Sequence, residues 1–259
     1  MKHIKKKFSY ARPVTEADEK ILERVAVSVG KEGISGAKKI PKNYQAILVT
    51  TESIGITAFQ YNHNGVNYFI PEPDPVLVYF NAAQTSIKRI ISSKADLFLA
   101  YRDQTVLTEK LQQHLYLYFG LTSGFIIFLF TAIEAFLNRE IPEEYEHRVV
   151  TKKKTEIYSK GQIEREFGFD VKMKDIIPVI HKKDFAKSYP LKQQSIQNLK
   201  EFRDSIVHIK ALQGGHTAYD YIFKKSLDFE YEKSLLAVRD LFNFYKQDYV
   251  EECDCGADI

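Results

Sequence analysis

The sequence predicts a mainly α-helical protein: a helical bundle preceded by a small N-terminal α/β region with an antiparallel hairpin. Two observations carry this prediction. From about Asn81 onward, apolar residues recur at helical spacing in several long segments, whereas residues 45–70 are rich in β-branched and aromatic residues. With 259 residues, of which 44% are hydrophobic, the chain is long enough to bury a sizeable core.

The N-terminal region is expected to contain one helix and a small sheet. Residues 14–30 begin with cap-type residues, carry apolar positions at helical spacing and end at Gly30. The stretches QAILVTT, GITAFQY and VNYFI read as strands, and NHNG at 62–65 separates the last two as a hairpin turn would. The proline-rich IPEPDP at 70–75 should end the sheet, because proline cannot donate a ladder hydrogen bond.

The rest of the chain is predicted to be helical, apart from one connector. Residues 141–170 are polar and lysine-rich, without a convincing element, and are interpreted as a flexible loop. The expected division is an N-terminal extension of unknown role over 1–95, a helical bundle over 96–250 and an acidic tail over 251–259. The predicted helices cover residues 82–103, 107–140, 172–185, 191–210 and 227–249.

Charge and cysteine usage exclude several classes of function. Because 37 basic and 34 acidic residues nearly balance, to a formal charge of +3, no global field favours nucleic acid, and any basic contact surface must be local. Cys253 and Cys255 are poorly spaced for a structural disulfide, and no other cysteine is available as a metal partner. The sequence therefore predicts no cofactor and no metal site. With no secretory signal at the N-terminus, a reducing cytoplasm is the expected location.

One segment competes for a membrane interpretation. Residues 115–133 carry no charge over about the length that spans a bilayer. The segment nevertheless contains Thr122, Ser123 and Thr131 and continues directly into Glu134. A helix that is hydrophobic all round is equally expected at the centre of a bundle or a dimer interface. The core interpretation is preferred, and a membrane anchor within residues 115–137 is the alternative.

The decapeptide EFRDSIVHIK, at 201–210, combines charged residues with a helical apolar stripe of Phe202, Ile206 and Ile209. Asp204 and His208 are one turn apart, so the carboxylate can accept a hydrogen bond from one imidazole nitrogen and fix the tautomer of the ring. The pattern alone also fits solvated charges beside a partly buried histidine.

A second polar pair lies in FTAIEAFLNREI, at 130–141. Glu134 and Asn138 are one turn apart on the most apolar helix, flanked by alanine, isoleucine, phenylalanine and leucine. A carboxylate in such surroundings is costly unless it is paired, and Arg203 is the obvious candidate to pair it.

These two segments together resemble the HEPN superfamily, the helical "higher eukaryotes and prokaryotes nucleotide-binding" domains. The resemblance rests on an apolar helix with AIEAFLN, a variable connector and a later helix ending in RDSIVH, which fits the family's Arg-x4-His motif. It covers roughly residues 107–250, and the first hundred residues take no part in it. It implies a bundle that dimerises so that two motifs form one composite site.

The resemblance also implies an activity and its residues. Many members of the superfamily are metal-independent endoribonucleases used in toxin, abortive-infection and CRISPR-linked defence, while others lack nuclease activity. By analogy Arg203 and His208 would be catalytic, and Asp204 and Glu134 would orient or polarise them. The expected partners are RNA, a second copy of the chain and a possible antitoxin or activator protein, with no membrane.

The chemistry follows from the residue types. RNA carries its own nucleophile, the 2′-hydroxyl, so cleavage to a 2′,3′-cyclic phosphate needs a proton acceptor or donor near neutral pH and a cation for the phosphoryl oxygens. Histidine and arginine supply these. The alternative is a non-catalytic module of the same type that binds RNA, nucleotide or a partner protein.

Overall fold

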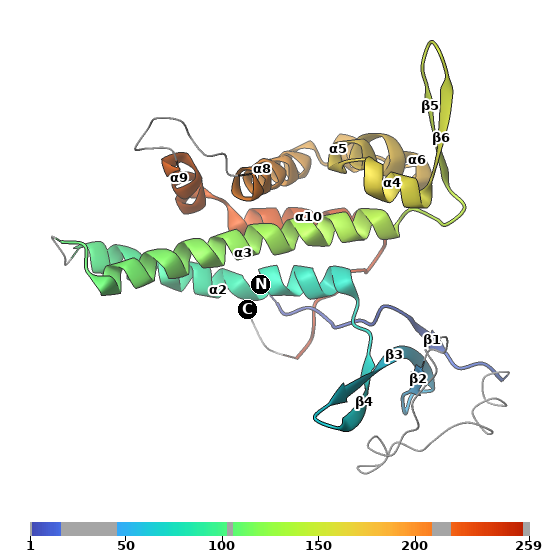
Figure 1. Cartoon of the computed structure of the whole chain (residues 1–259), viewed down its shortest axis with the longest axis horizontal. Coiled ribbons are helices and arrows are strands. Elements are labelled where there is room, and N and C mark those ends of the chain that lie inside the picture. Colours follow the sequence, from blue (N-terminus) through green and yellow to red (C-terminus); the bar gives the residue numbers. More distant parts are fainter. Residues whose placement is uncertain (1, 17–45, 103–105, 209–218, 256–259) are drawn as a thin grey trace. The chain divides into compact units, whose positions relative to one another are not determined.

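The computed structural model describes residues 2–16, 46–102, 106–208 and 219–255 (Figure 1). The chain divides into two compact units, Lys6–Leu77 on the one hand and Met1–Lys5 with Val78–Ile259 on the other. The division therefore falls near Leu77 and not at residue 95, which lies inside the continuous helix α2, Pro75–Arg102. The mainly helical class with a small antiparallel sheet is as the sequence predicts.

The smaller unit contains an antiparallel sheet in which one strand, β3 (Ile54–His63), pairs with each of the other three strands. The three predicted strands are confirmed, and the hairpin turn between β3 and β4 has positive φ at Asn64 and Gly65, the two residue types that tolerate it. No local pattern indicated the three-residue β1. Residues 17–30 of the predicted N-terminal helix lie outside the described residues. The strands are β1 (Ala11–Pro13), β2 (Ala46–Val49), β3 (Ile54–His63) and β4 (Val66–Pro71).

Helix α2 begins earlier than predicted, directly after the sheet. The Asp74 carboxylate accepts hydrogen bonds from the backbone N–H groups of Val76 and Leu77, at 3.0 and 3.4 Å, and so caps the helix. Pro75 takes the first helical position, where its missing N–H costs nothing. The proline-rich segment that ends the sheet therefore also starts the helix.

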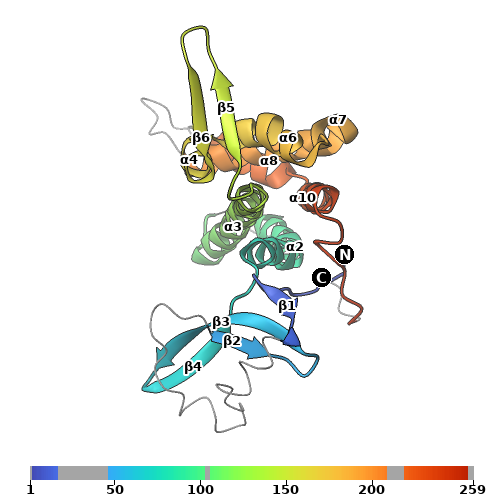
Figure 2. The ribbon, with the colours of Figure 1, turned by 90° about the vertical axis from the view of Figure 1, so that its right-hand side faces the viewer.

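The larger unit is built around α3, Glu109–Arg139. This helix packs against α8 (Pro190–Val207), α9 (Asp220–Asp228) and α10 (Tyr231–Tyr245), and Figure 2 shows it end-on among its neighbours. Aromatic side chains fill the contact; the rings of Phe136 and Phe242 lie 4.5 Å apart.

By its length and composition the apolar helix α3 could cross a membrane, although half of its most apolar stretch is buried by other parts of the chain. Leu129, Phe130 and Ile133 are among the side chains that the bundle covers. One such helix is weak support for a span, and the packing is compatible with a soluble protein.

The interpretation of residues 141–170 as a structureless loop is wrong. They form a hairpin, β5 (Glu146–Val150) with β6 (Thr155–Ser159), followed by α4 (Lys160–Glu166). In both views the hairpin projects from the helices (Figures 1 and 2). Its strands alternate only between exposed and half-buried positions, so they lack the apolar period that identifies a strand. The start of α4 is a capping box between Ser159 and Gln162.

The single helix predicted over 172–185 is broken into short pieces. Pro178 cannot donate to the carbonyl four residues earlier, and a π-helical turn, η1, precedes it. Lys182 then adopts a left-handed conformation, with φ of 53°, and ends the run. The pieces are α5 (Phe169–Val171), η1 (Lys172–Ile176), α6 (Ile177–His181) and α7 (Phe185–Ser188).

The last predicted helix, over 227–249, is also divided. Phe229 is extended, with ψ of 135°, and separates α9 from α10. Its ring packs between Phe202 and Tyr231, with centroid distances of 5.2 and 5.1 Å. The contacts of this half-buried ring with the two neighbouring rings offset the loss of helical hydrogen bonds at the break.

Candidate functional site

Helices α3 and α8 bring Glu134 and Arg203 together at the edge of their interface. Arg203 Nη2 lies 2.7 Å from Glu134 Oε1, which confirms the pairing that the apolar surroundings of Glu134 predict. On α8, Leu199 and Phe202 are fully buried and face the bundle. Because Arg203 follows Phe202 directly, its backbone lies at the margin of the buried face, from which the long side chain reaches α3.

Arg203 makes two further contacts that hold its guanidinium. Its Nη1 donates to Asp204 Oδ1 at 2.9 Å, and its Cζ stands 4.2 Å from the centroid of the Phe130 ring. The side chain of Arg203 is 21% exposed, so these interactions are only partly screened by water. The planar fork thus bridges two carboxylates while stacking on an aromatic face, a combination that lysine cannot reproduce.

Two lysines outside the predicted site extend this cluster. Lys200 Nζ lies 3.1 Å from Asp204 Oδ2 and 3.4 Å from Asp170 Oδ2. Lys172 is buried and donates to Asn138 Oδ1 at 2.7 Å. The spacing of Lys200 and Asp204, one helical turn, was visible in the sequence, whereas the approach of α5 and η1 was not.

Burial lowers the pKa of Lys172, while the nearby negative charges of Glu134 and Glu164 oppose that shift. Attraction between the Lys172 ammonium and the Glu134 carboxylate thus favours the charged lysine, against the larger effect of burial. The side-chain oxygen of Asn138 accepts a hydrogen bond from this lysine and so helps to fix its position.

His208 stands apart from this network. His208 is the C-cap of α8, with φ of −108° and ψ of 46°, and it is exposed to solvent. The expected hydrogen bond from its ring to Asp204 is not present: the two oxygens of Asp204 contact Arg203 and Lys200, and only the backbone N–H of His208 bonds to the Asp204 carbonyl. The helix ends at the histidine, so the i, i+4 geometry that the prediction assumed is lost for its side chain.

The four candidate residues thus form a joined group of three and one neighbour. Arg203 is in direct contact with both Glu134 and Asp204, and His208 lies at the end of α8. Of the predicted apolar stripe, Phe202 is buried and Ile206 half-buried, while Ile209 lies outside the described residues.

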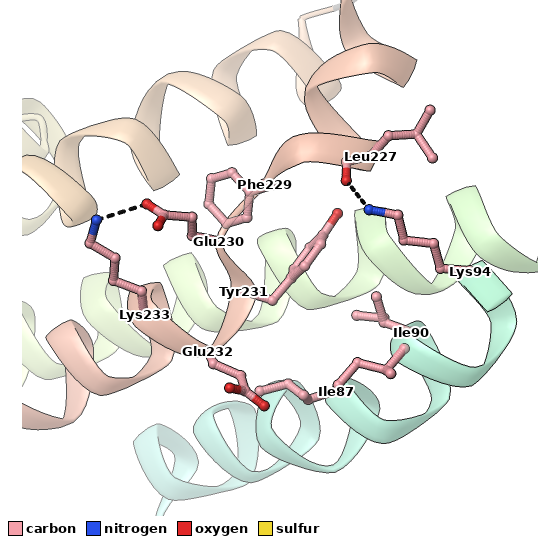
Figure 3. Close-up of a pocket in the computed structure, with 10 residues that line it drawn as sticks. Ile87, Ile90, Lys94, Leu227, Phe229, Glu230, Tyr231, Glu232 and Lys233 are labelled. Carbon is pink, nitrogen blue, oxygen red and sulfur yellow. Dashed lines mark hydrogen bonds and ion pairs between the residues drawn. The ribbon is translucent and has the colours of Figure 1, made fainter.

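A separate pocket of about 440 Å³ opens between α2, α9 and α10 (Figure 3). Its apolar wall includes Ile87 and Ile90, and an ion pair of 2.8 Å between Lys233 and Glu230 lies at its rim. Lys94 donates to the backbone carbonyl of Leu227 across it. Neither Arg203 nor His208 lines this pocket. It is therefore separate from the motif cluster, the group formed by Glu134, Arg203, Asp204 and His208.

Cys253 and Cys255, which were expected to lack a further metal ligand, have one beside them. His3 is close to both cysteines, and the ligand atoms of the three residues are all within 4.8 Å of one another. No spacing rule reveals this group, because its members come from opposite ends of the sequence.

Comparison with known proteins adds no relative: no family model, no curated protein and no solved structure matches this chain.

Proposed function

We propose that this chain is a metal-independent endoribonuclease of HEPN type, acting in the cytoplasm as a toxin or antiphage-defence effector. The observation that carries the proposal is the Arg-x4-His motif together with the anchored state of its arginine. Glu134, Asp204 and Phe130 hold the Arg203 guanidinium at the end of α8 where His208 is exposed. Preorganised charge of this kind stabilises a transition state at little reorganisation cost.

In the proposed reaction the 2′-hydroxyl of RNA attacks the adjacent phosphorus and the 5′-oxygen leaves. A 2′,3′-cyclic phosphate and a 5′-hydroxyl result. Neutral His208 accepts the proton of the 2′-hydroxyl, and Arg203 stabilises the charge on the phosphoryl oxygens. Glu134 and Asp204 set the orientation of the guanidinium.

The same chemistry favours a homodimer. Departure of the 5′-oxygen needs a proton donor in addition to the acceptor of the 2′-hydroxyl proton. In the described part of the chain, the end of α8 presents a single imidazole, that of His208. A second copy facing the first would supply a protonated His208 as the acid. An antitoxin or activator protein would then act by blocking or aligning this shared site.

A second candidate is a non-catalytic module of the same type that binds RNA, nucleotide or a partner protein. One observation favours it: Arg203 is already bonded to two carboxylates, so a phosphate must compete with both for the guanidinium. Among the described residues, the Asp204 carboxylate bonds to Lys200 and Arg203 and not to the ring of His208. The imidazole thus lacks the orienting partner that a catalytic histidine usually has, which also favours the binding module.

The deciding experiment is incubation of purified protein with single-stranded and hairpin RNA in EDTA, with analysis of the product ends. Cyclic-phosphate products are expected from the wild type, and a 2′-deoxy substitution at the cleaved position should block them. His208→Ala and Arg203→Ala should each lower the rate by at least about 100-fold, the usual scale of acid–base catalysis. The control is His63→Ala, which removes an exposed imidazole in the β3–β4 hairpin.

Intact RNA in every tube, with RNA binding retained and weakened by Arg203→Ala, would favour the binding module. Cleavage that survives His208→Ala would overturn the catalytic assignment. In cells, toxicity that disappears with Arg203→Ala or His208→Ala but persists with His63→Ala would support the nuclease.

A further inference from the structure

The two ends of the chain meet in a group of three metal-ligating side chains that lies outside the motif cluster. The ligand atoms of His3, Cys253 and Cys255 are all within 4.8 Å of one another, and Cys255 Sγ is 3.4 Å from His3 Nδ1. His3 and Cys253 are half-buried and Cys255 is exposed. All three belong to the larger compact unit.

Backbone pairing explains why the three side chains converge. Ile4 and Glu252 form an antiparallel bridge, and hydrogen bonds run from Cys253 N to the His3 carbonyl and from Lys5 N to the Glu251 carbonyl. In an antiparallel pair, residues directly opposite share a face, and so do residues two apart on one strand. His3 therefore shares a face with its partner Cys253 and with Cys255.

The same register is visible in two neighbouring side chains. Lys5 and Glu251, the next pair on that face, form an ion pair of 2.8 Å. Ile4 points to the other face and is only 2% exposed, so its burial anchors the N-terminal segment. The convergence of the two thiols and the imidazole thus follows from an anchored register and not from a single flexible side chain.

The chemistry of the group selects the ion. Two thiolates and one imidazole are soft or intermediate ligands that suit Zn²⁺ and disfavour Mg²⁺ and Ca²⁺, which take oxygen. Zn–S and Zn–N bonds of about 2.3 and 2.05 Å at tetrahedral angles require about 3.6 Å between sulfur and nitrogen and about 3.8 Å between the sulfurs. The 3.4 Å between Cys255 Sγ and His3 Nδ1 is close to the first value, and small side-chain rotations bring the rest of the group within reach.

We propose that His3, Cys253 and Cys255 bind one Zn²⁺ ion per chain, with water completing the coordination, and that the ion fastens the two chain ends to each other. This site is independent of the proposed nuclease activity, because it shares no residue with the Arg203 cluster. Its role is structural: an ion that binds only the folded chain end stabilises that pairing.

The test uses the full, untagged chain, because a histidine tag would bind the same ion. Protein reduced and freed of metal is titrated with Zn²⁺ against a chromogenic chelator, and separately with Co²⁺ as a spectroscopic probe. One equivalent of Zn²⁺ should bind. Co²⁺ should produce thiolate charge-transfer absorption together with the visible bands of tetrahedral coordination. Excess Mg²⁺ or Ca²⁺ should not displace the Zn²⁺.

Three single variants and one control decide the assignment. Cys253→Ser, Cys255→Ser and His3→Ala should each weaken Zn²⁺ binding by at least about 100-fold, because loss of a mere hydrogen-bond partner of a ligand already costs about 10- to 100-fold. His63→Ala should bind as the wild type does. Zn²⁺ should also raise the melting temperature of the wild type but not of Cys253→Ser.

Two results would overturn the proposal. One is the absence of stoichiometric binding to the reduced wild type. The other is binding that persists with unchanged Co²⁺ absorption in the Cys253→Ser and Cys255→Ser variants. Because none of these readouts uses RNA, failure here is distinguishable from failure of the nuclease proposal.

Discussion

The motif cluster and the group of His3, Cys253 and Cys255 are held together in different ways. Glu134 and Arg203 stand on long helices whose apolar faces are buried, and they neutralise each other without any added group. His3 and the two cysteines stand on short extended segments joined by a bridge and a few backbone hydrogen bonds. The first site is preorganised by packing, whereas the second rests on fewer contacts and would gain rigidity from the proposed ion.

This difference has an energetic consequence. A side chain on a packed helix loses its place only when the bundle opens, whereas a chain end can detach locally. Substitutions in the motif helix should therefore lower the global free energy of unfolding. Substitutions in the terminal segment should be limited by the cost of releasing that segment.

The largest expected effect is that of Phe202→Ala. The ring is fully buried on α8 and packs against Phe229 at 5.2 Å, so its removal should lower the free energy of unfolding by about 3–5 kcal/mol. Urea unfolding followed by circular dichroism measures it.

The matched variant for that prediction is Ile4→Ala, at a residue that is also buried. Its cost should be smaller, because residues 2–5 can detach without opening the bundle. An equal or greater loss for Ile4→Ala would show that the terminal segment is an integral part of the core, and would break the contrast between the two sites.

A middle-sized effect is expected for Arg203→Ala. The change removes hydrogen bonds to Glu134 and Asp204 and the stacking on Phe130, and leaves Glu134 beside an apolar surface. We expect a loss of about 1–3 kcal/mol, below the cost of breaking a fully buried pair because Glu134 is 45% exposed.

Arg203→Lys should recover only part of this loss, since an ammonium does not supply the planar fork. The control is Lys224→Ala, whose ion pair with Asp220 is fully exposed and should contribute much less to stability. Equal stability of Arg203→Ala and Lys224→Ala would mean that the motif arginine is not held by its contacts.

The smallest effect concerns the pH dependence of stability. Burial lowers the pKa of His181 below its ordinary 6.5, and the charge of Glu140, 3.2 Å away, opposes the shift only in part. Between the lowered pKa and 6.5 the unfolded chain binds more protons, so stability should fall as the pH drops through this window.

His181→Gln removes the titrating ring, and the decline in stability between about pH 7.5 and 5.5 should shrink in urea unfolding. His63→Gln, at an exposed position, should leave the decline unchanged. An identical decline in wild type and His181→Gln would contradict the assignment.

Much of the motif site could be predicted from local pattern. The apolar surroundings of Glu134 indicated that it needs a cation, and the position of Arg203 on an amphipathic helix made it the candidate; the 2.7 Å contact agrees. The ring of His208 was placed wrongly because the prediction extended α8 to residue 210, while the helix ends at Val207. A helix end depends on local capping and on the contacts of the next segment, neither of which a periodic pattern contains.

The sequence by itself determined the mainly helical class, the three strands of the small sheet and the arginine–carboxylate pair, because each depends on residue periodicity or on the cost of burying charge. Only the tertiary structure decided the β5–β6 hairpin, the break at Phe229 and the meeting of His3 with Cys253 and Cys255. The hairpin joins neighbouring strands that have no buried apolar face, and the other two features depend on contacts between segments distant in sequence. None of them leaves a local apolar period to recognise.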